Sequence, residues 1–355
     1  MPPTIQAMAW GEPSSHMKPV RIRLEASSIC QLRCPVCPTG QRKTRDSVCG
    51  SGRLSFADFK RLLDQNKFVH EVELSNWGEV FLNRDLPAIL EYAFSRDVKV
   101  TIANGANLNH ASDAVLEMLV RTGVEELVVA LDGATSETYG KYRIRGNFDR
   151  VITNVKKINS FKERYGSERP RLIWQFIIFG HNENEIDAAR TMARSLNMVF
   201  SPKLNAVPDY SPVINAAKVR SSSGLREVSA GEDWGLGMCS QLWLSPQINW
   251  DGKILGCCHN NWQEFGGNAF EDGLDSSLNS EKIVYARKML IGKAPSRDDI
   301  PCSRCEFYLR MAGRDKWVRP RRIHAQMLAE RLFPRWRQVY RSLRRTLTAP
   351  LRRIS

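Results

Sequence analysis

The sequence predicts an α/β fold in which a parallel sheet, open or partly closed, is covered by helices. Between residues 20 and 204, short apolar segments typical of strands alternate with segments of helical periodicity. Because parallel strands need a crossover between them, this alternation favours a parallel sheet with helices on its face. The six strand candidates are residues 21–26, 71–75, 98–103, 126–132, 171–179 and 198–204.

The segments between these strands predict helices after residue 55, near residue 116 and at residues 148–161. Two pairs of residues have the spacing of a helix N-terminal cap: Ser55 with Asp58, and Asn182 with Glu185. Each pair precedes a segment with an apolar face. We therefore expect a helix to begin at each of these points.

Length and composition narrow the class of protein. A chain of 355 residues can form one large domain and a smaller one. The first residues lack the basic and apolar regions of a secretory signal, and no apolar run reaches the length of a membrane span. Nine cysteines in such a chain indicate metal binding in a reducing compartment, not disulfides. We expect a cytoplasmic protein.

Three cysteines follow the first strand candidate at C-x3-C-x2-C spacing: Cys30, Cys34 and Cys37. Thiolates this close in sequence can occupy three corners of a cubane iron–sulfur cluster, which leaves one iron open to another ligand. A structural zinc site is the alternative. Zinc sites usually begin with C-x2-C pairs and need a fourth ligand, so the spacing favours iron–sulfur.

This loop resembles the cluster-binding loop of the radical S-adenosylmethionine (SAM) enzymes. The resemblance implies a [4Fe-4S] cluster whose open iron binds the methionine part of SAM. It also implies an external one-electron donor, reductive cleavage of SAM and hydrogen abstraction from a substrate by the 5′-deoxyadenosyl radical. The implied fold is a partial (β/α)6 barrel over residues 20–204, with its chemistry at the carboxyl ends of the strands.

Further segments resemble the cofactor-binding motifs of that family. Gly78 and Glu79 match the second half of its G-G-E-P segment, where a carboxylate can pair with the ammonium group of SAM. Asn104 lies in a sequence similar to the family's T-N-G turn. Arg143 is the implied cofactor contact in a longer pattern, with Arg145 as the competing residue. Each piece alone is weak, whereas their order after the cysteine loop is specific.

A second cysteine set follows a connector at residues 205–235, which is rich in proline and serine. Cys239, Cys257, Cys302 and Cys305 supply four thiolates, enough to complete a cubane. The pattern resembles the short SPASM/twitch auxiliary-cluster domain of radical SAM enzymes, which implies a second [4Fe-4S] cluster in a small α+β domain at residues 236–312. A zinc ribbon is the alternative.

Asp251-Gly252 lies between two apolar runs of this region and predicts a β-hairpin. Two cysteines, Cys49 and Cys258, are left over, and an ordinary buried thiol is the expected state of each. Cys258 is also a candidate hydrogen donor to a substrate radical, or a substitute cluster ligand, because it adjoins Cys257.

The basic charge of the chain is concentrated in its C-terminal tail, residues 313–355, whereas residues 1–19 form a short N-terminal segment. The net charge is +14, and most of it lies beyond Leu309. The tail predicts a basic amphipathic helix, which can bind an anionic surface such as the inner membrane face. Nucleic acid is a second and less favoured partner. A terminal helix packed on the protein is the third interpretation.

Together these resemblances imply a radical SAM oxidoreductase, and the short form of the auxiliary domain implies that it oxidises a polar small molecule of the sugar or cyclitol type. A radical SAM maturase of peptides is the alternative, although the segment before the first strand is too short for a leader-binding domain. A sugar epimerase is another alternative, and a zinc protein that binds nucleic acid is the remote one.

Overall fold

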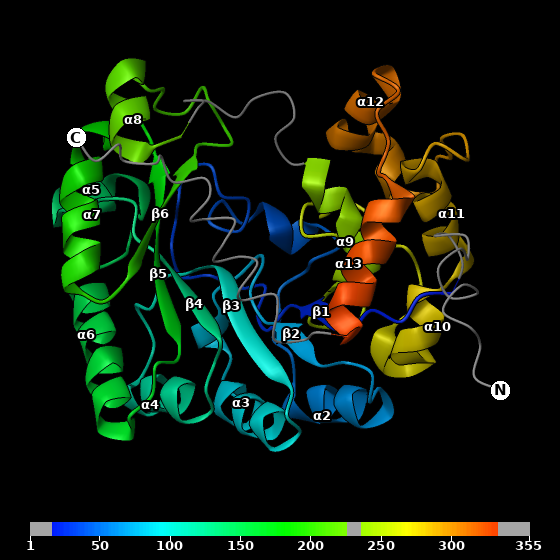
Figure 1. Cartoon of the computed structure of the whole chain (residues 1–355), viewed down its shortest axis with the longest axis horizontal. Coiled ribbons are helices and arrows are strands. Elements are labelled where there is room, and N and C mark those ends of the chain that lie inside the picture. The colour runs from blue at the N-terminus through cyan, green and yellow to red at the C-terminus, as the bar shows by residue number, and fades with distance from the viewer. Residues whose placement is uncertain (1–15, 226–235, 333–355) are drawn as a thin grey trace.

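The computed structural model describes residues 16–225 and 236–332 (Figure 1). Its centre is one sheet with the strand order β6-β5-β4-β3-β2-β1-β7-β8. The neighbours from β6 to β7 are parallel, and only β7 and β8 are antiparallel. The predicted parallel sheet is confirmed, and it is open because β6 and β8 form its edges. The strands are β1 (Arg21–Leu24), β2 (Glu71–Glu73), β3 (Lys99–Ala106), β4 (Glu126–Ala130), β5 (Arg171–Ile178), β6 (Val199–Leu204), β7 (Gln247–Ile248) and β8 (Ile254–Gly256).

Six helices cover the outer side of the parallel strands (Figure 1). These helices bury apolar side chains, such as Phe59, Leu62 and Leu63 of the first. The Ser55 side chain accepts a hydrogen bond from the Asp58 N–H, as the capping spacing predicts. The helices are α2 (Phe56–Gln65), α3 (Leu86–Ser95), α4 (Asp113–Arg121), α5 (Ser136–Tyr142), α6 (Phe148–Tyr165) and α7 (Ile186–Ser195).

The second predicted cap is wrong. The Asn182 side chain makes no cap hydrogen bond. Its oxygen accepts from the Phe179 N–H, and its amide nitrogen donates to the carbonyls of Asp132 and Ile177. Asn182 therefore ties together the chain segments that follow β4 and β5. The short segment Glu183–Glu185 then precedes α7, which begins at Ile186.

The predicted turn around Asn104 is also wrong, because residues 103–105 belong to β3. The register of β3 against β4 shifts between Ile102 and Ala106, and Gly105 has a φ of 95°. Such an irregularity bends the strand without ending it. The Ala103 N–H donates to the Glu73 carboxylate. Side chains of the neighbouring strand thus replace the backbone partners that a regular ladder would supply.

The C-terminal part begins with α8 (Ala216–Ser223) and α9 (Gln241–Leu244), and the β7–β8 hairpin follows. The hairpin turns at Asp251-Gly252 as predicted, with Gly252 at a φ of 87°. β7 also pairs in parallel with β1, where Arg23 faces Gln247. The hairpin therefore extends the barrel sheet instead of forming a separate one. The remaining helices are α10 (Leu274–Leu278), α11 (Glu281–Leu290), α12 (Glu306–Gly313) and α13 (Pro320–Leu332).

A second contact fastens the hairpin to the barrel. The carbonyl of Cys49 accepts hydrogen bonds from Trp250 Nε1 at 2.8 Å and from Asn249 Nδ2 at 3.1 Å. Gly52 lies against the Trp250 ring so closely that a Cβ atom there would overlap it. Cys49 itself is fully buried, as expected for one of the leftover thiols. The loop that follows the first cysteine set is thus held by the C-terminal part.

Helix α13 lies within the predicted tail and packs beside α9, with Ile323 and Met327 buried. This arrangement agrees with a packed terminal helix over residues 320–332. Residues 333–355, on which the membrane prediction mainly rests, lie outside the described residues, as do residues 1–15. No helix within 16–225 and 236–332 is long and apolar enough to span a bilayer.

We expect Gly52→Ala to lower the free energy of unfolding by about 1–3 kcal/mol, because the added methyl group overlaps a ring that is itself packed. Urea denaturation of anaerobically purified protein measures the change. Gly140→Ala in α5 is the control, since a Cβ atom there meets nothing within 4 Å. Equal stability of the two variants would contradict this account of the interface.

Candidate cofactor and metal sites

The first cysteine set lies in the loop after β1, at the carboxyl edge of the parallel strands. The Cys37 N–H donates to the Cys34 carbonyl at 3.2 Å, which closes a tight turn between these two ligand candidates. Gly40 packs on the same turn; a Cβ atom there would lie 2.8 Å from both N and O of Cys34. The loop therefore has a compact and defined path.

The three thiols share one environment. Cys34 is buried in a cluster with Leu32, Tyr142 and Phe179, against which Cys30 and Cys37 are partly buried. Burial raises the pKa of Cys30 to about 12, and the Glu79 carboxylate and the other two sulfurs add to the rise. The sulfurs are thus close enough to interact electrostatically, as the sequence spacing predicts.

Arg143 supplies positive charge to this cluster of thiols. Its Nη1 lies 3.8 Å from Cys34 Sγ, and its Nε and Nη2 each lie 2.6 Å from Oδ2 of the buried Asp132. Burial raises the pKa of Cys34, and the Arg143 guanidinium opposes that rise. Arg145, the competing residue, is exposed with a φ of 72°. The structure therefore directs Arg143, and not Arg145, to the cysteine loop.

Within residues 16–225 and 236–332, no three Cys, His, Asp or Glu side chains converge on the position of a single metal ion. A cubane cluster is held differently, because each thiolate binds a different iron atom. Three thiols around a compact loop, with a neighbouring guanidinium to offset negative charge, suit a cluster of that kind.

Glu25, which the sequence analysis did not identify, holds the segment at residues 76–79. It is buried directly after β1. Its Oε2 accepts from the Trp77 N–H at 2.8 Å, and its Oε1 accepts from the Gly78 N–H at 3.4 Å. Burial raises the pKa of Glu25 to about 7, although these backbone donors oppose the rise.

Position 78 must be glycine because the backbone of another segment lies directly against it. A Cβ atom at Gly78 would overlap the Ser27 carbonyl oxygen and would lie 2.6 Å from the Ile29 nitrogen. The close approach is thus made by the start of the cysteine loop. The Trp77 indole nitrogen in the same segment is buried and has no hydrogen-bond partner. An unpaired buried donor beside the cysteine loop is consistent with a ligand site.

Glu79 is also buried and bound to backbone. Its carboxylate accepts from the N–H groups of Asn107 at 2.8 Å and Phe81 at 3.3 Å, and burial raises its pKa to about 7. Its own N–H donates to the Ile29 carbonyl at 2.8 Å. The predicted pairing of Glu79 with an ammonium group stays a prediction. What the structure adds is that Glu79 also anchors the cysteine loop.

A cavity opens beside this loop, above the carboxyl ends of β3, β5 and β6. Its volume is about 510 Å³. Amide and aromatic side chains and one lysine line it. Asn104, one of the residues predicted to bind the cofactor, is among them. The lining residues are Val36, Asn104, Tyr142, Gln175, Ile177, Phe179, Lys203, Leu204, Asn205, Ala206 and Val207.

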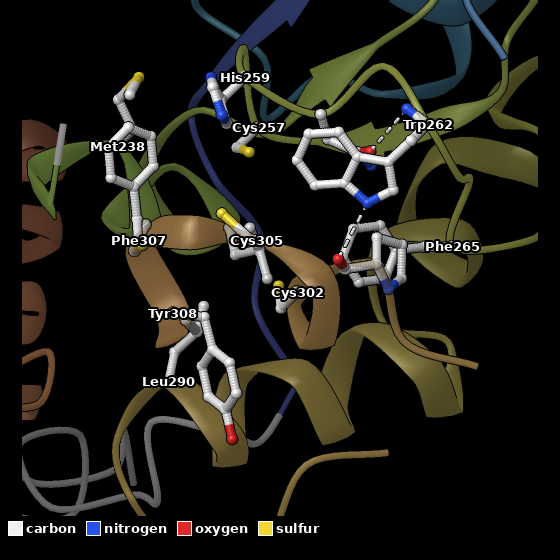
Figure 2. A pocket seen from close by; sticks show the side chains of 14 residues that line it. Met238, Cys257, His259, Trp262, Phe265, Leu290, Cys302, Cys305, Phe307 and Tyr308 are labelled. Carbon is white, nitrogen blue, oxygen red and sulfur yellow. Dashed lines mark hydrogen bonds between the residues drawn. The ribbon is translucent and has the colours of Figure 1, made fainter. Parts of the chain in front are cut away.

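The second cysteine set meets in one pocket (Figure 2). The chain reaches it from four places: the turn at Leu236–Ser240, the end of β8, the turn at Pro301–Arg304, and the start of α12. Apolar and aromatic side chains, including Trp262, Phe265 and Phe307, enclose it. Trp262 Nε1 donates a hydrogen bond to the Pro301 carbonyl at 3.1 Å and so stabilises the turn at Pro301–Arg304. The four thiols are Cys239, Cys257, Cys302 and Cys305.

These four sulfurs interact with one another. Burial raises the pKa of Cys257 to about 12, with Cys258 and Cys305 as further causes. Burial also raises the pKa of Cys302, and the sulfurs of Cys257 and Cys239 add to it. Four buried thiols in an apolar pocket can close a cubane completely. The described residues therefore fit a second cluster, which stays a prediction.

Cys258 takes no part in that pocket's lining. Its Sγ lies 3.3 Å from Gln241 Nε2 and 3.4 Å from Met238 Sδ. Its N–H donates to Gln241 Oε1 at 2.8 Å. Cys258 and Cys49 are likewise absent from the residues that line the larger cavity. The Cys258 thiol therefore contacts Gln241 and Met238, which precede it by about twenty residues, and lines neither cavity.

Comparison with known proteins identifies the class. Residues 24–194 match the family model described as the radical SAM superfamily. This stretch runs from the last residue of β1 to the end of α7 and includes all three cysteines of the first set. The region is therefore a radical SAM domain.

One relative and two solved structures of a single protein extend the comparison. The chain is 26% identical over 140 residues to the AdoMet-dependent heme synthase of Methanosarcina barkeri, a match that covers 39% of this chain and 38% of that protein. SuiB of Streptococcus suis bound to S-adenosylmethionine is similar in structure, with a TM-score of 0.59 and 17% identity, over 85% of this chain and 75% of that one. SuiB bound to its precursor peptide SuiA has a TM-score of 0.58, with 16% identity, and covers 82% of this chain and 70% of that one. At this identity the likeness supports the fold.

Three buried residues of the first site were missed by sequence reasoning: Glu25, Asn107 and Asp132. Glu25 and Asp132 each follow an apolar strand, and this position is a usable signal for a site at a sheet edge. Asn107 gives no such signal. It follows β3 directly, and its amide nitrogen approaches Cys30 Sγ at 3.8 Å only because that strand runs further than predicted.

We expect Glu25→Gln to lower the free energy of unfolding by about 1–3 kcal/mol, because the new amide group faces a backbone N–H that then lacks an acceptor. Urea denaturation measures the change. Glu71→Gln serves as the control, since Glu71 is partly exposed and its nearest cation, Arg21, lies 3.7 Å away. A loss no greater than that of the control would contradict the role of Glu25.

Proposed function

We propose that this chain is a radical SAM oxidoreductase with two [4Fe-4S] clusters, the second in a SPASM/twitch-type domain. The observation that carries the proposal is the position of the three-cysteine loop beside a cavity at the strand ends, within a region that matches the radical SAM superfamily. Cys30, Cys34 and Cys37 would hold the first cluster. Cys239, Cys257, Cys302 and Cys305 would hold the second.

When bound, the first cluster supplies an electron, received from an external donor, that cleaves SAM to a 5′-deoxyadenosyl radical able to take a hydrogen atom from the substrate. The residues proposed for SAM are Gly78, Glu79, Asn104 and Arg143. Glu79 would orient the ammonium group, and Arg143 would offset negative charge at Cys34. The apolar wall formed by Tyr142 and Phe179 would exclude water from the reacting atoms.

We favour oxidation of the substrate over epimerisation. An epimerase needs a hydrogen donor beside the substrate radical, and Cys258 was the candidate thiol. Its Sγ is engaged with Gln241 and Met238, and Cys258 is not among the residues that line the cavity. Cys49 is fully buried. The net change would be the loss of two hydrogens from a polar C–H bond, as in the conversion of a secondary alcohol to a ketone.

The amide side chains of the cavity suit a substrate rich in hydroxyl groups. The Asn104 amide oxygen can accept and the Gln175 amide nitrogen can donate a hydrogen bond, and the aromatic rings offer apolar faces. The Asn205 amide is instead bound to the backbone of Val207 and Tyr210. A sugar or cyclitol is therefore the leading substrate class. The second candidate is a ribosomally made peptide, which is favoured by the structural likeness to SuiB bound to its precursor peptide.

Anaerobically reconstituted protein should bind about eight irons per chain, four for each cubane. Replacing Cys30, Cys34 and Cys37 by alanine should halve the iron content and abolish 5′-deoxyadenosine formation. Iron analysis and chromatography of the reaction products measure both. A chain that binds zinc in stoichiometric amount, or that forms 5′-deoxyadenosine without these cysteines, would refute the proposal.

Replacing Cys302 and Cys305 by alanine should also remove about four irons. It should leave measurable reductive cleavage of SAM, because the first cysteine loop and its cavity belong to the barrel. Cys258→Ala is the matched control and should retain the full iron content. An unchanged iron content in the double variant would exclude the four-thiolate assignment.

A further inference from the structure

The two cysteine sets are far apart in sequence, yet one short segment contacts residues adjacent to each of them. This segment, residues 75–79, follows β2. At its end, Gly78 packs on Ser27 and Ile29, and the Glu79 N–H donates to the Ile29 carbonyl at 2.8 Å. The segment therefore fits against the residues that precede Cys30 with no free space between the backbones.

At its beginning, the same segment reaches the second cysteine set through Asn76. Asn76 Nδ2 donates to the Cys258 carbonyl at 3.2 Å. Cys258 directly follows Cys257, one of the four thiols of the enclosed pocket. The position of this carbonyl consequently depends on how the residue before it is held.

Asn76 is joined to the cavity as well. Asn104 Nδ2 donates to the backbone oxygen and to the Oδ1 of Asn76, each at 3.0 Å. Asn104 lines the cavity. A continuous series of hydrogen bonds thus runs from the carbonyl beside Cys257, through the Asn76 side chain, to a side chain in the cavity wall.

We propose that Asn76 is a positioning residue that couples occupancy of the second cysteine site to SAM binding at the first. The inference rests on the proposed function. With Cys257 bound to iron, the following residue, Cys258, has a restrained orientation, and its carbonyl, in the peptide between residues 258 and 259, holds the Asn76 amide. The amide in turn presents Oδ1 to Asn104. Without the second cluster that orientation is lost, and Asn104 and the 76–79 segment lose a restraint.

Coupling of this kind is measured as a ratio of affinities, and values of about 5-fold to 150-fold are typical. We expect the lower end, because one neutral hydrogen bond carries the link. Removal of the second cluster should therefore weaken SAM binding about 5-fold in a chain with Asn76. The same removal should have no further effect in Asn76→Ala, which already lacks the link.

The experiment is a double-mutant cycle on SAM binding by anaerobic, reconstituted full-length protein. Four proteins are compared by equilibrium dialysis with labelled SAM: wild type, the Cys302→Ala and Cys305→Ala double variant, Asn76→Ala, and their combination. The change that SAM causes in the electron paramagnetic resonance spectrum of the reduced first cluster is the second readout. It reports on the cofactor geometry and does not respond to a mere loss of stability.

Two further variants separate this role from general stabilisation of the interface. Trp250→Phe is the matched control, because it removes another hydrogen bond between the same two parts of the chain, to the Cys49 carbonyl, and keeps a ring against Gly52. It should leave the 5-fold effect of cluster removal intact. Cys302→Ser provides a milder way to disturb the second site if the double alanine variant does not fold.

The inference is overturned if cluster removal weakens SAM binding by the same factor with and without Asn76, or if Trp250→Phe abolishes the coupling as fully as Asn76→Ala. An absence of any effect of cluster removal in the wild type also overturns it. If the wild type binds no SAM at all, the proposed function fails and the inference fails with it. If the wild type binds SAM but cluster removal and Asn76→Ala weaken that binding independently, only this inference is contradicted.

Discussion

The contact between Gly78 and the residues that precede Cys30 is the constraint on which the first site depends. The cysteine loop leaves β1 at Leu24 and must pass over the end of β2 before its thiols can gather. It can do so only because no Cβ atom projects at Gly78. The buried Glu25 carboxylate also stabilises this crossing, because it accepts hydrogen bonds from the N–H groups of Trp77 and Gly78. A negative charge in an apolar interior is costly, and these donors offset that cost.

Strand β1 connects this crossing to the rest of the molecule, because it pairs on one side with β2 and on the other with β7. The barrel and the C-terminal part therefore share a sheet instead of meeting across a surface. Trp250 adds a side-chain contact to the loop after the first cysteines. A hydrogen-bonded ladder is a stiff connection, so the distance between the two cysteine sets is set largely by backbone geometry.

Much of this arrangement follows from sequence patterns. Alternating apolar segments predict all six strands of the barrel, and cysteine spacing predicts both groups of thiols that the structure brings together. What the sequence could not reveal depends on neighbours distant in the chain. Residues 103–105 look like a turn locally, but Glu73 on the adjacent strand offers acceptors that keep them in β3. Asn182 has cap spacing, yet its amide is drawn to carbonyls at residues 132 and 177. The pairing of β7 with β1 has no local signal, since it joins residues more than two hundred positions apart.

That last pairing also has a consequence for how the chain is made. During synthesis from the N-terminus, β1 can pair with β2 soon after both emerge, but its other side must wait until residue 247 has left the ribosome. Over that interval β1 is an exposed strand edge, which other chains can recognise. Arg21 and Arg23 alternate along it with buried Ile22 and Leu24. Charged side chains on an edge strand discourage pairing between molecules, and Arg21 and Arg23 place such charges along this edge.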